Sequence, residues 1–322
     1  MHPDNARELK SRILGLVAGT PRAQRAGEAP RRLWIAVGLI PVERGRFRVA
    51  VRLEREADRE VLPDLAGAAQ NELDVRVIGR VHVLSAPATR WSPRALQQRV
   101  RPLRPGLSVA HATVSAGTLG GFVRTGEGLA IVSNNHVLAA SNAASAGDAV
   151  LQPGPADSGM TTDRVATLRS FEPLRPGAPN RVDAALATLD PGLTAEPGDL
   201  PGGPLGTAVV HHLEIDPDED VEKVGRTTGH TRGRISAVEV DGVAVQYDHV
   251  VHTFDDQVEI EGRGGAFSAG GDSGSVIWRT RDRAPLGLLF AGSTTGGSGG
   301  AGVTFANPLG TVLEVLGADW VS

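Results

Sequence analysis

From residue 107 to its end, the chain consists of short apolar runs that alternate with turn-forming residues. Runs such as GLAIVSN, RVATLRS, VDAALATLD and GRISAVEV are rich in Val, Ala, Leu and Ile, and Gly, Pro, Asp and Ser separate them. Many short strands at close spacing are typical of an all-β barrel or sandwich. Only the last stretch, ANPLGTVLEVLGADW, indicates a helix. We therefore predict a mainly β region that ends in a helix.

The first 106 residues follow a different pattern. Residues 5–17 have the apolar spacing of a helix, and a loop rich in Pro, Gly and Arg follows. Two apolar runs around Glu-Arg-Gly-Arg predict a β-hairpin. A helix is predicted over 57–73 and a third strand over 74–85, and together these elements form a β-β-α-β module. The expected divisions are a helix and loop (1–30), a small α+β module (31–89), a linker (90–106) and the main β domain (107–322).

Composition indicates the class of protein and its compartment. The chain has 322 residues, of which 40% are hydrophobic and 22% charged, as in soluble globular proteins. It has no cysteine, which excludes disulfides and suits a reducing compartment. Charges interrupt the N-terminal apolar residues, unlike in a signal peptide, and no apolar run is long enough to span a membrane. We expect a cytoplasmic protein without membrane contact.

Charge is unevenly distributed along the chain. Residues 1–106 carry 20 Lys and Arg against 11 Asp and Glu, whereas the remainder carries 13 against 26. A basic segment can contact nucleic acid or anionic lipid, and it can also dock against the acidic part of its own chain. Because the basic residues are scattered over strand-like segments and do not form a cluster, docking is favoured and nucleic-acid binding is not.

The stretch FSAGGDSGSVIW, residues 267–278, places Gly-Gly-Asp-Ser-Gly-Ser between two apolar runs. These residues are common in tight turns. They also fit a turn that carries a nucleophilic serine, Ser273, with backbone N–H groups that face one point. A serine hydroxyl attacks efficiently only when a neighbouring base, usually a histidine held by a carboxylate, removes its proton. The second interpretation therefore requires a histidine and a carboxylate elsewhere.

Two residues meet that requirement. His136 lies in GLAIVSNNHVLAAS, directly after an apolar strand, so that its imidazole is expected to face a cleft. Asp183 begins the apolar strand of NRVDAALATLD. Each residue alone fits a structural role better. Together with Ser273 they stand in the order His, Asp, Ser, separated by 47 and 90 positions.

In this order the sequence resembles the trypsin/chymotrypsin-like serine proteases. SNNHVLA is similar to their histidine motif, RVDAALATL to their aspartate strand and GGDSGS to their serine motif. VGRTTGHTRGRI, residues 224–235, resembles a hairpin of the bacterial branch. RPLRPGLSVAHATVSAGTLGGFV resembles an entry segment of a cysteine-free bacterial group related to the plant narrow-leaf proteases. The resemblance implies two six-stranded β-barrels behind the N-terminal module.

The order of the motifs argues against other hydrolases. An α/β-hydrolase presents its serine first, in Gly-x-Ser-x-Gly, and here Ser275 occupies the position of the last glycine. A subtilisin places aspartate before histidine. A second Asp-Ser-Gly, at residues 157–159, is interpreted as a turn. Adjacent His211 and His212 would point apart on a strand, and the acidic run 214–220 fits a solvated loop. We therefore expect no metal and no cofactor.

The resemblance also assigns the residues around Ser273. The amides of Gly271 and Ser273 form the oxyanion hole. The carboxylate that matches Asp272 pairs with a new N-terminal amine in digestive relatives and with a basic side chain in bacterial ones. Because more than a hundred residues precede the protease domain, a basic partner is expected without N-terminal trimming, and the candidates are Lys223 and Arg226.

Substrate preference is predicted from the residues that match the primary pocket. Phe267 stands where an acid would select Arg or Lys, and the strand that holds Phe290, Ala291 and Gly292 forms the other wall. A neutral side chain of small to medium size is therefore expected.

The sequence thus predicts an intracellular serine endopeptidase of limited specificity. It would process a particular protein or peptide partner, and its N-terminal module would gate the cleft or recruit a regulatory partner. Two alternatives remain at this point: a latent or inactive protease-fold module that binds and regulates, and nucleic-acid contact through residues 1–106.

Overall fold

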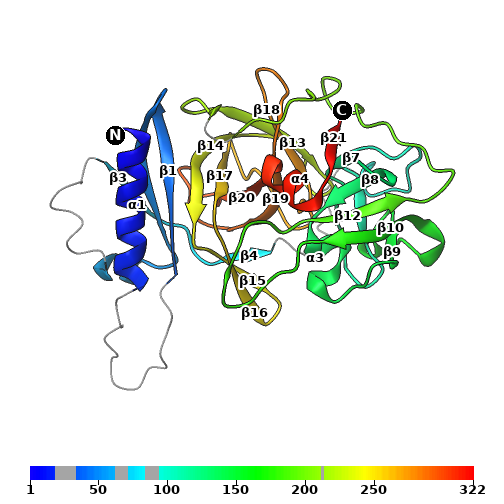
Figure 1. Cartoon of the computed structure of the whole chain (residues 1–322), viewed down its shortest axis with the longest axis horizontal. Helices are drawn as coiled ribbons and strands as arrows, with labels where there is room; N and C mark the ends of the chain where they lie inside the picture. Colours follow the sequence, from blue (N-terminus) through cyan, green and yellow to red (C-terminus); the bar gives the residue numbers. More distant parts are fainter. Residues whose placement is uncertain (19–33, 62–71, 84–93, 212–213) are drawn as a thin grey trace.

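Two β-sheets of unequal size form most of the molecule. The computed structural model describes residues 1–18, 34–61, 72–83, 94–211 and 214–322. The smaller sheet has the strand order β21-β7-β8-β12-β10-β9-β5-β6, and it lies at one side of the molecule in Figure 1. Its strands are β5 (Ser108–His111), β6 (Gly117–Thr118), β7 (Gly121–Thr125), β8 (Gly128–Ser133), β9 (Ala149–Leu151), β10 (Arg164–Phe171), β12 (Ala185–Leu189) and β21 (Asp319–Val321).

Six strands of the larger sheet close into a barrel. Each strand pairs with the next in the ring β13-β14-β17-β20-β19-β18, and β18 returns to β13. The six are β13 (Asp220–Gly225), β14 (Gly229–Asp241), β17 (Gln257–Gly262), β18 (Val276–Arg279), β19 (Pro285–Gly292) and β20 (Thr304–Pro308). Within the closed ring every strand has a partner on both sides, and the parts of β14 and β19 that extend beyond the ring pair with β1 (Ile35–Glu43) and β4 (Val81–Val83).

A hairpin, a short strand and several short helices complete the region after residue 107. The hairpin is β15 (Val243–Tyr247) with β16 (Val250–Phe254), and β11 (Pro179–Asn180) pairs with β16. The helix α4 follows the barrel at Leu309–Leu316 and ends at Gly317, whose φ of 61° suits a left-handed cap. The shorter helical turns are α3 (Asn135–Leu138), η2 (Ala140–Asn142), η3 (Pro155–Asp157) and η4 (Thr161–Asp163).

The predicted fold class is confirmed: the chain is mainly β, with a double-barrel architecture and a C-terminal helix. One detail differs from the prediction of two six-stranded barrels. Among the described residues, the smaller sheet follows an open path of eight strands and does not return to its first strand. Its last strand, β6, has only two residues and so offers few backbone groups for further pairing.

The N-terminal segment contains both predicted and unpredicted elements. The helix α1 (Pro3–Ala18) and the hairpin of β1 (Ile35–Glu43) and β2 (Arg46–Leu53) are as expected. The predicted helix over 57–73 overlaps a short turn, η1 (Glu56–Val61), and its centre, 62–71, lies outside the described residues. The predicted third strand is divided into β3 (Leu73–Val77) and β4 (Val81–Val83). Gly79 between them has a φ of +72°, which favours glycine.

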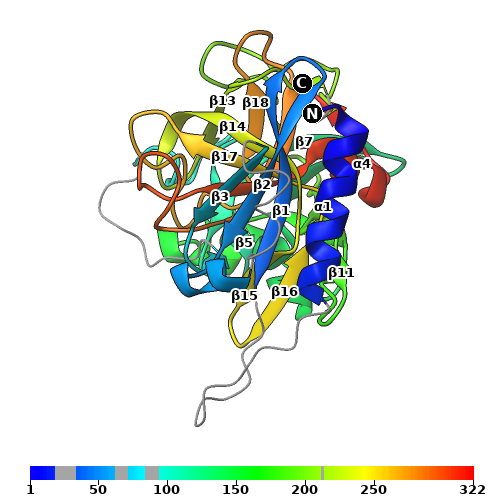
Figure 2. The same ribbon diagram turned by 90° about the vertical axis from the view of Figure 1, so that its left-hand side faces the viewer.

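The N-terminal strands continue the larger sheet. β1 pairs with β14 across the predicted boundary between the small module and the β domain. In Figure 2, α1 lies along β1 and β2 on one side of the molecule. Ala6 and Ile13 of α1 are fully buried in the same hydrophobic cluster as Val37. The boundaries at residues 30, 89 and 106 stay predictions, but the strands β1 to β4 belong to the same sheet as the barrel strands that follow residue 106.

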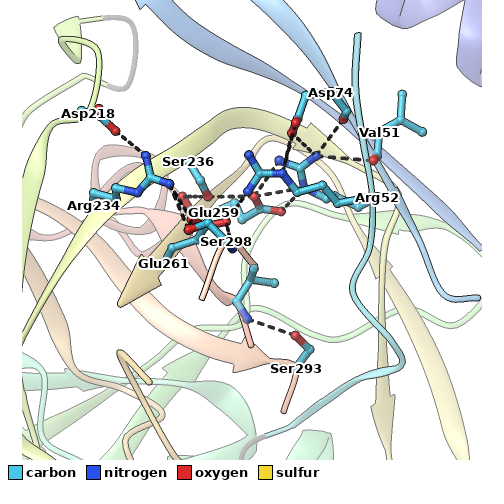
Figure 3. Close-up of polar contacts among 12 residues, drawn as sticks. Val51, Arg52, Asp74, Asp218, Arg234, Ser236, Glu259, Glu261, Ser293 and Ser298 are labelled. Atoms are coloured by element: carbon cyan, nitrogen blue, oxygen red, sulfur yellow. Dashed lines mark hydrogen bonds and ion pairs between the residues drawn. The ribbon is translucent and has the colours of Figure 1, made fainter. Parts of the chain in front are cut away.

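Ion pairs connect the basic N-terminal segment to the acidic remainder. The buried guanidinium of Arg52 lies between Glu259 and Asp74, at 2.8 Å and 2.9 Å (Figure 3). Lys10 also crosses the boundary and reaches Asp241 at 2.8 Å. The basic excess of residues 1–106 therefore neutralises part of the acidic excess of the same chain, as the docking interpretation predicts. None of the described helices is both long enough and apolar enough to cross a membrane.

Replacing Arg52 by Met is expected to lower the free energy of unfolding by about 3–5 kcal/mol, because a fully buried Glu259 would lose its cation. Urea unfolding measures this loss. The variant that also carries Glu259→Gln removes the uncompensated charge and should recover part of the stability. A single Arg52→Met variant as stable as the wild-type protein would contradict a structural role for this pair.

Candidate active site

His136 and Asp183 are brought together by the pairing of two strands. β8 ends at Ser133 and β12 begins at Ala185, and these two residues face each other in the antiparallel register. His136, three residues after the end of β8, and Asp183, two residues before the start of β12, therefore lie at the same end of the two paired strands. The Asp183 side chain is fully buried there, and its Oδ2 atom lies 2.5 Å from His136 Nδ1. The other carboxylate oxygen accepts the backbone N–H of His136 at 3.2 Å.

A buried tyrosine that the sequence analysis did not identify completes this pair. Tyr247, at the end of β15, donates its hydroxyl to Asp183 Oδ2 at 2.7 Å, and its ring lies edge-on to the His136 imidazole. Burial and, secondly, the charge of Asp183 raise the pKa of the Tyr247 phenol well above its usual value, so the phenol stays a donor. The alternation of VAVQY predicts an inward side chain. Its partner, 64 residues earlier in the chain, is not visible in the sequence.

Replacing Tyr247 by Phe keeps the ring and removes this one hydrogen bond. Hydrogen bonds to charged groups typically contribute about 1.5–3 kcal/mol, so the free energy of unfolding should fall by that amount. The comparison of urea unfolding between the variant and the wild-type protein tests this. A Phe254→Leu variant changes a ring contact of Tyr247 and leaves the carboxylate bond, which makes it the matched control. Equal stability of Tyr247→Phe and the wild-type protein would contradict the role.

The short strand β6 contacts both Ser273 and the segment that carries His136. The backbone carbonyl of Ser273 accepts the N–H of Thr118 at 2.8 Å. A Cβ atom on Gly117 would lie 2.4 Å from a methyl of Val137, the neighbour of His136, and 3.1 Å from the Ser273 carbonyl oxygen. Glycine at 117 thus allows both segments to approach the same strand. Among the described residues, Ser273 Oγ contacts the carbonyl oxygen of Phe290 at 3.4 Å and makes no hydrogen bond to His136.

Two threonines fix the turn before Ser273. The hydroxyl of Thr227 donates to the carbonyl of Gly270 at 2.6 Å, and that of Thr118 donates to the carbonyl of Gly271 at 2.8 Å. In a trans peptide the N–H points opposite to the C=O, so the Gly271 N–H points away from Thr227. Neither this N–H nor that of Ser273 has an acceptor among the described residues. Gly271 has a φ of +93°, which favours glycine.

Asp272 is buried and accepts from several donors. Its carboxylate accepts the backbone N–H of Thr227 at 2.8 Å, that of Thr228 at 3.1 Å and the Thr228 hydroxyl at 2.6 Å. The Lys223 ammonium, also fully buried, lies 3.2 Å away. Burial lowers the pKa of Lys223 from its usual value, and the charge of Asp272 acts in the opposite direction. Of the two basic candidates, Lys223 is therefore the partner of Asp272.

Arg226 has a different partner, which corrects the second candidate. Its Nε donates to Asp157 at 2.7 Å, and both side chains are almost completely buried. Asp157 belongs to the Asp-Ser-Gly that was interpreted as a turn. Ser158 indeed has the φ of +68° of a turn, but the aspartate before it also anchors the segment that carries Thr227. The aspartate that precedes Ser158 in the sequence was the signal that could have revealed this ion pair.

The residues predicted to wall the substrate pocket lie in or beside the larger sheet. The side chains of Phe267 and Phe290 are packed in hydrophobic clusters, 2% and 0% exposed, and Phe290 contacts the ring of Phe254 at 4.7 Å. Their side chains are therefore part of the core in this structure, and the assignment of these residues to the substrate pocket stays a prediction. Phe290 belongs to β19, and Phe267 lies in the segment between β17 and β18. Ala291 and Gly292 pair with β4.

A cavity of about 410 Å³ lies beside His136. It is lined by three segments that belong to different parts of the chain, namely 113–116, 140–143 and 246–248. Tyr247 and Asp248 enclose it from the β15–β16 hairpin.

The described residues, which include the acidic run 214–220, contain no group of three His, Cys, Asp or Glu side chains that could hold a metal ion.

Comparisons with known proteins gave matches among solved structures only. No family model and no curated protein matches the chain. Protease A from Thermobifida fusca is 19% identical, with 68% of this chain and all of that chain covered and a TM-score of 0.47. A glutamic acid-specific serine protease has 19% identity, the same coverage and a TM-score of 0.49. Nocardiopsis protease has 18% identity and a TM-score of 0.48, again with 68% of this chain and all of that chain covered. Likeness at this level assigns neither an activity nor a substrate to this chain.

Proposed function

We propose that this chain is a trypsin/chymotrypsin-like serine endopeptidase. The buried His136–Asp183 pair, with 2.5 Å between Nδ1 and Oδ2, is the observation that carries the proposal. An aspartate in this position holds the imidazole in one tautomer and leaves Nε2 free to accept a proton. The adjacent turn supports the proposal, because the free N–H groups of Gly271 and Ser273 suit a developing oxyanion.

In the proposed reaction, His136 Nε2 takes the proton of the Ser273 hydroxyl while Oγ attacks a peptide carbonyl. The negative oxygen of the tetrahedral intermediate is stabilised by the two N–H groups. His136 then gives the proton to the leaving amine, and an acyl-enzyme forms. Water, deprotonated by the same imidazole, releases the acid and restores the serine. Asp183 stabilises the imidazolium in both steps.

One rearrangement precedes the first step. Ser273 Oγ, which lies 3.4 Å from the carbonyl oxygen of Phe290, has to come within hydrogen-bond distance of His136 before it can lose its proton. Catalytic hydrogen bonds are often long before substrate binds and shorten in the complex. The same observation favours the alternative function, a latent protease-fold module whose site is assembled only with a partner.

The finer parts of the proposal come from the sequence. They are limited specificity toward a particular protein, a cytoplasmic location, a regulatory role for the N-terminal segment, and membership of the cysteine-free bacterial group related to the plant narrow-leaf proteases. The ion pairs between that segment and the barrel support a role within the same molecule over one in nucleic-acid binding.

Labelling with a fluorophosphonate probe, read by intact mass, tests the proposal. A single adduct is expected on the wild-type protein and none on Ser273→Ala or His136→Ala. Ser158→Ala, in the other Asp-Ser-Gly of the chain, is the matched control and should label as the wild-type protein does. A folded wild-type protein that takes no adduct would refute an assembled site and favour the latent module.

A further inference from the structure

The three-residue strand β4 lies between β15 and β19. It runs antiparallel to β19, with Val83 opposite Ala291 and His82 opposite Gly292. On its other side it runs parallel to β15, with Val81 opposite Val245 and His82 opposite Gln246. Figure 1 shows β4 as a short strand near the centre of the molecule, above the β15–β16 hairpin. A segment that precedes the β domain thus fills a position inside its larger sheet.

Both neighbours of β4 lead directly to the candidate active site. In β19, the residue before Ala291 is Phe290, whose carbonyl oxygen lies 3.4 Å from Ser273 Oγ. β15 ends at Tyr247, which binds Asp183. Because the pairing with β19 is antiparallel, β4 runs from its first to its last residue toward the Ser273 end of that strand. A peptide bound in the same direction as β4 would present the acyl side of a peptide bond to Ser273.

Without β4, the facing edges of β15 and β19 would border a slot one strand wide. Paired strands lie about 4.8 Å apart, so an extended peptide fits such a slot and can bond to both edges. Strand addition of this kind uses backbone groups and places few demands on sequence. The buried Val81 and Ile78, in one hydrophobic cluster with Val245 and Ala291, anchor the start of β4 in the slot.

We propose that this slot accepts an extended polypeptide strand and that residues 81–83 occupy it in cis, in competition with any peptide that approaches Ser273. The catalytic consequence rests on the proposed serine endopeptidase function, whereas the occupancy of the slot does not. The occupant of the slot is the chain itself: three residues in extended conformation, paired through their backbone.

A competitor within the same chain lowers the apparent affinity for peptides by the fraction of molecules in which the slot is free. Tethering gives β4 a high effective concentration, typically in the millimolar range. Its own pairing covers only three residues, and such short strands are weak when isolated. A peptide that pairs over more residues than β4 can therefore displace it. Regulation would act through the strength with which β4 is held.

Two probes of Ser273 separate the slot from the nucleophile. Diisopropyl fluorophosphate needs only the nucleophile and the oxyanion hole, whereas acetyl-Ala-Ala-Ala diphenyl phosphonate also needs the peptide slot. The variant His82→Pro removes a backbone N–H from a strand paired on both sides, which a central strand does not tolerate. The variant His82→Ala keeps that N–H and serves as the control.

For His82→Pro, the rate constant of the peptidyl probe should rise about tenfold or more relative to that of the small probe. The ratio for His82→Ala should stay within about twofold of the wild-type value, with equal melting temperatures as the check on folding. An unchanged ratio in a folded His82→Pro variant would overturn the proposal.

Amide hydrogen exchange of the wild-type protein gives a test that needs no variant. The amides of residues 81–83 should be protected in the free protein and in the small adduct, and should lose protection in the peptidyl adduct. Retained protection in the peptidyl adduct would overturn competition for the slot.

If neither probe labels Ser273, the proposed function fails and the slot is tested by binding alone. The peptide acetyl-Gly-Arg-Val-His-Val-amide, residues 79–83, should protect the one amide of the pair Ala291 and Gly292 that faces the slot in His82→Pro, and it should have no effect on the wild-type protein. Absence of protection in the variant would overturn the occupancy itself.

Discussion

Replacing Asp183 by Asn is expected to lower the rate of Ser273 labelling and of peptide hydrolysis by about 10⁴-fold, as this change does in other Ser-His-Asp enzymes. In the wild-type protein the carboxylate only accepts, from His136 Nδ1, from the His136 backbone and from Tyr247. An asparagine has one accepting oxygen and one donating nitrogen. Whichever way the amide is turned, at least one present donor faces a donor, and the imidazole loses its orientation.

The measurement is the second-order rate constant for a fluorophosphonate, together with urea unfolding to confirm that the variant folds. Tyr247→Phe is the matched control, since it removes one bond to the same carboxylate and keeps the carboxylate itself. Its labelling rate should lie much nearer to the wild-type value. Asp183→Asn labelling within tenfold of the wild-type rate, in a folded protein, would show that His136 is not the base for Ser273.

Replacing Lys223 by Met should lower the free energy of unfolding by about 3–5 kcal/mol. Lys223 and Asp272 are both fully buried, 3.2 Å apart, and no other cation is paired with Asp272 in the described part of the chain. Removing the ammonium therefore leaves a buried carboxylate without its counter-charge. Because Asp272 lies between Gly271 and Ser273, the turn that presents the oxyanion amides should also shift, and labelling of Ser273 should fall in parallel.

The double variant Lys223→Met, Asp272→Asn separates charge from packing. It removes both charges, so its loss of stability should be smaller than the sum of the two single losses, as expected for residues in contact. Arg226→Met is the comparison for the rejected candidate, because it breaks the pair with Asp157 and leaves Asp272 its ammonium. If the loss of stability in the double variant equals the sum of the losses in Lys223→Met and Asp272→Asn, the two residues do not stabilise each other.

The order of three motifs led to the prediction of His136, Asp183 and Ser273 as a triad, and the structure brings His136 and Asp183 into direct contact. Strand pairing explains this contact, since a residue after β8 and a residue before β12 lie at the same end of the paired strands. Alternation of short apolar runs likewise predicted the mainly β architecture. Both predictions depend on short sequence patterns, which do not require knowledge of contacts between distant segments.

Contacts between distant segments could not be predicted in this way. Nothing near Tyr247 indicates that its hydroxyl meets Asp183, and nothing near residues 81–83 indicates that they enter the sheet beside Gly292. The choice between Lys223 and Arg226 depended on side-chain direction in two positions three residues apart, which the twist of the barrel determines. Phe267 and Phe290 were assigned to a pocket by position, and the sequence did not show that their side chains would be 2% and 0% exposed.

The pairing of β1 with β14 has a consequence for the synthesis of this protein. The chain leaves the ribosome from its N-terminus, so β1 and β2 are made about two hundred residues before β14 and before Glu259, the buried counter-ion of Arg52. At about 5–20 residues per second, the hairpin waits roughly 10–40 s for its partner strand. During that interval one strand edge of the hairpin is open to other chains. A nascent chain that stalls before residue 241 carries this open edge permanently.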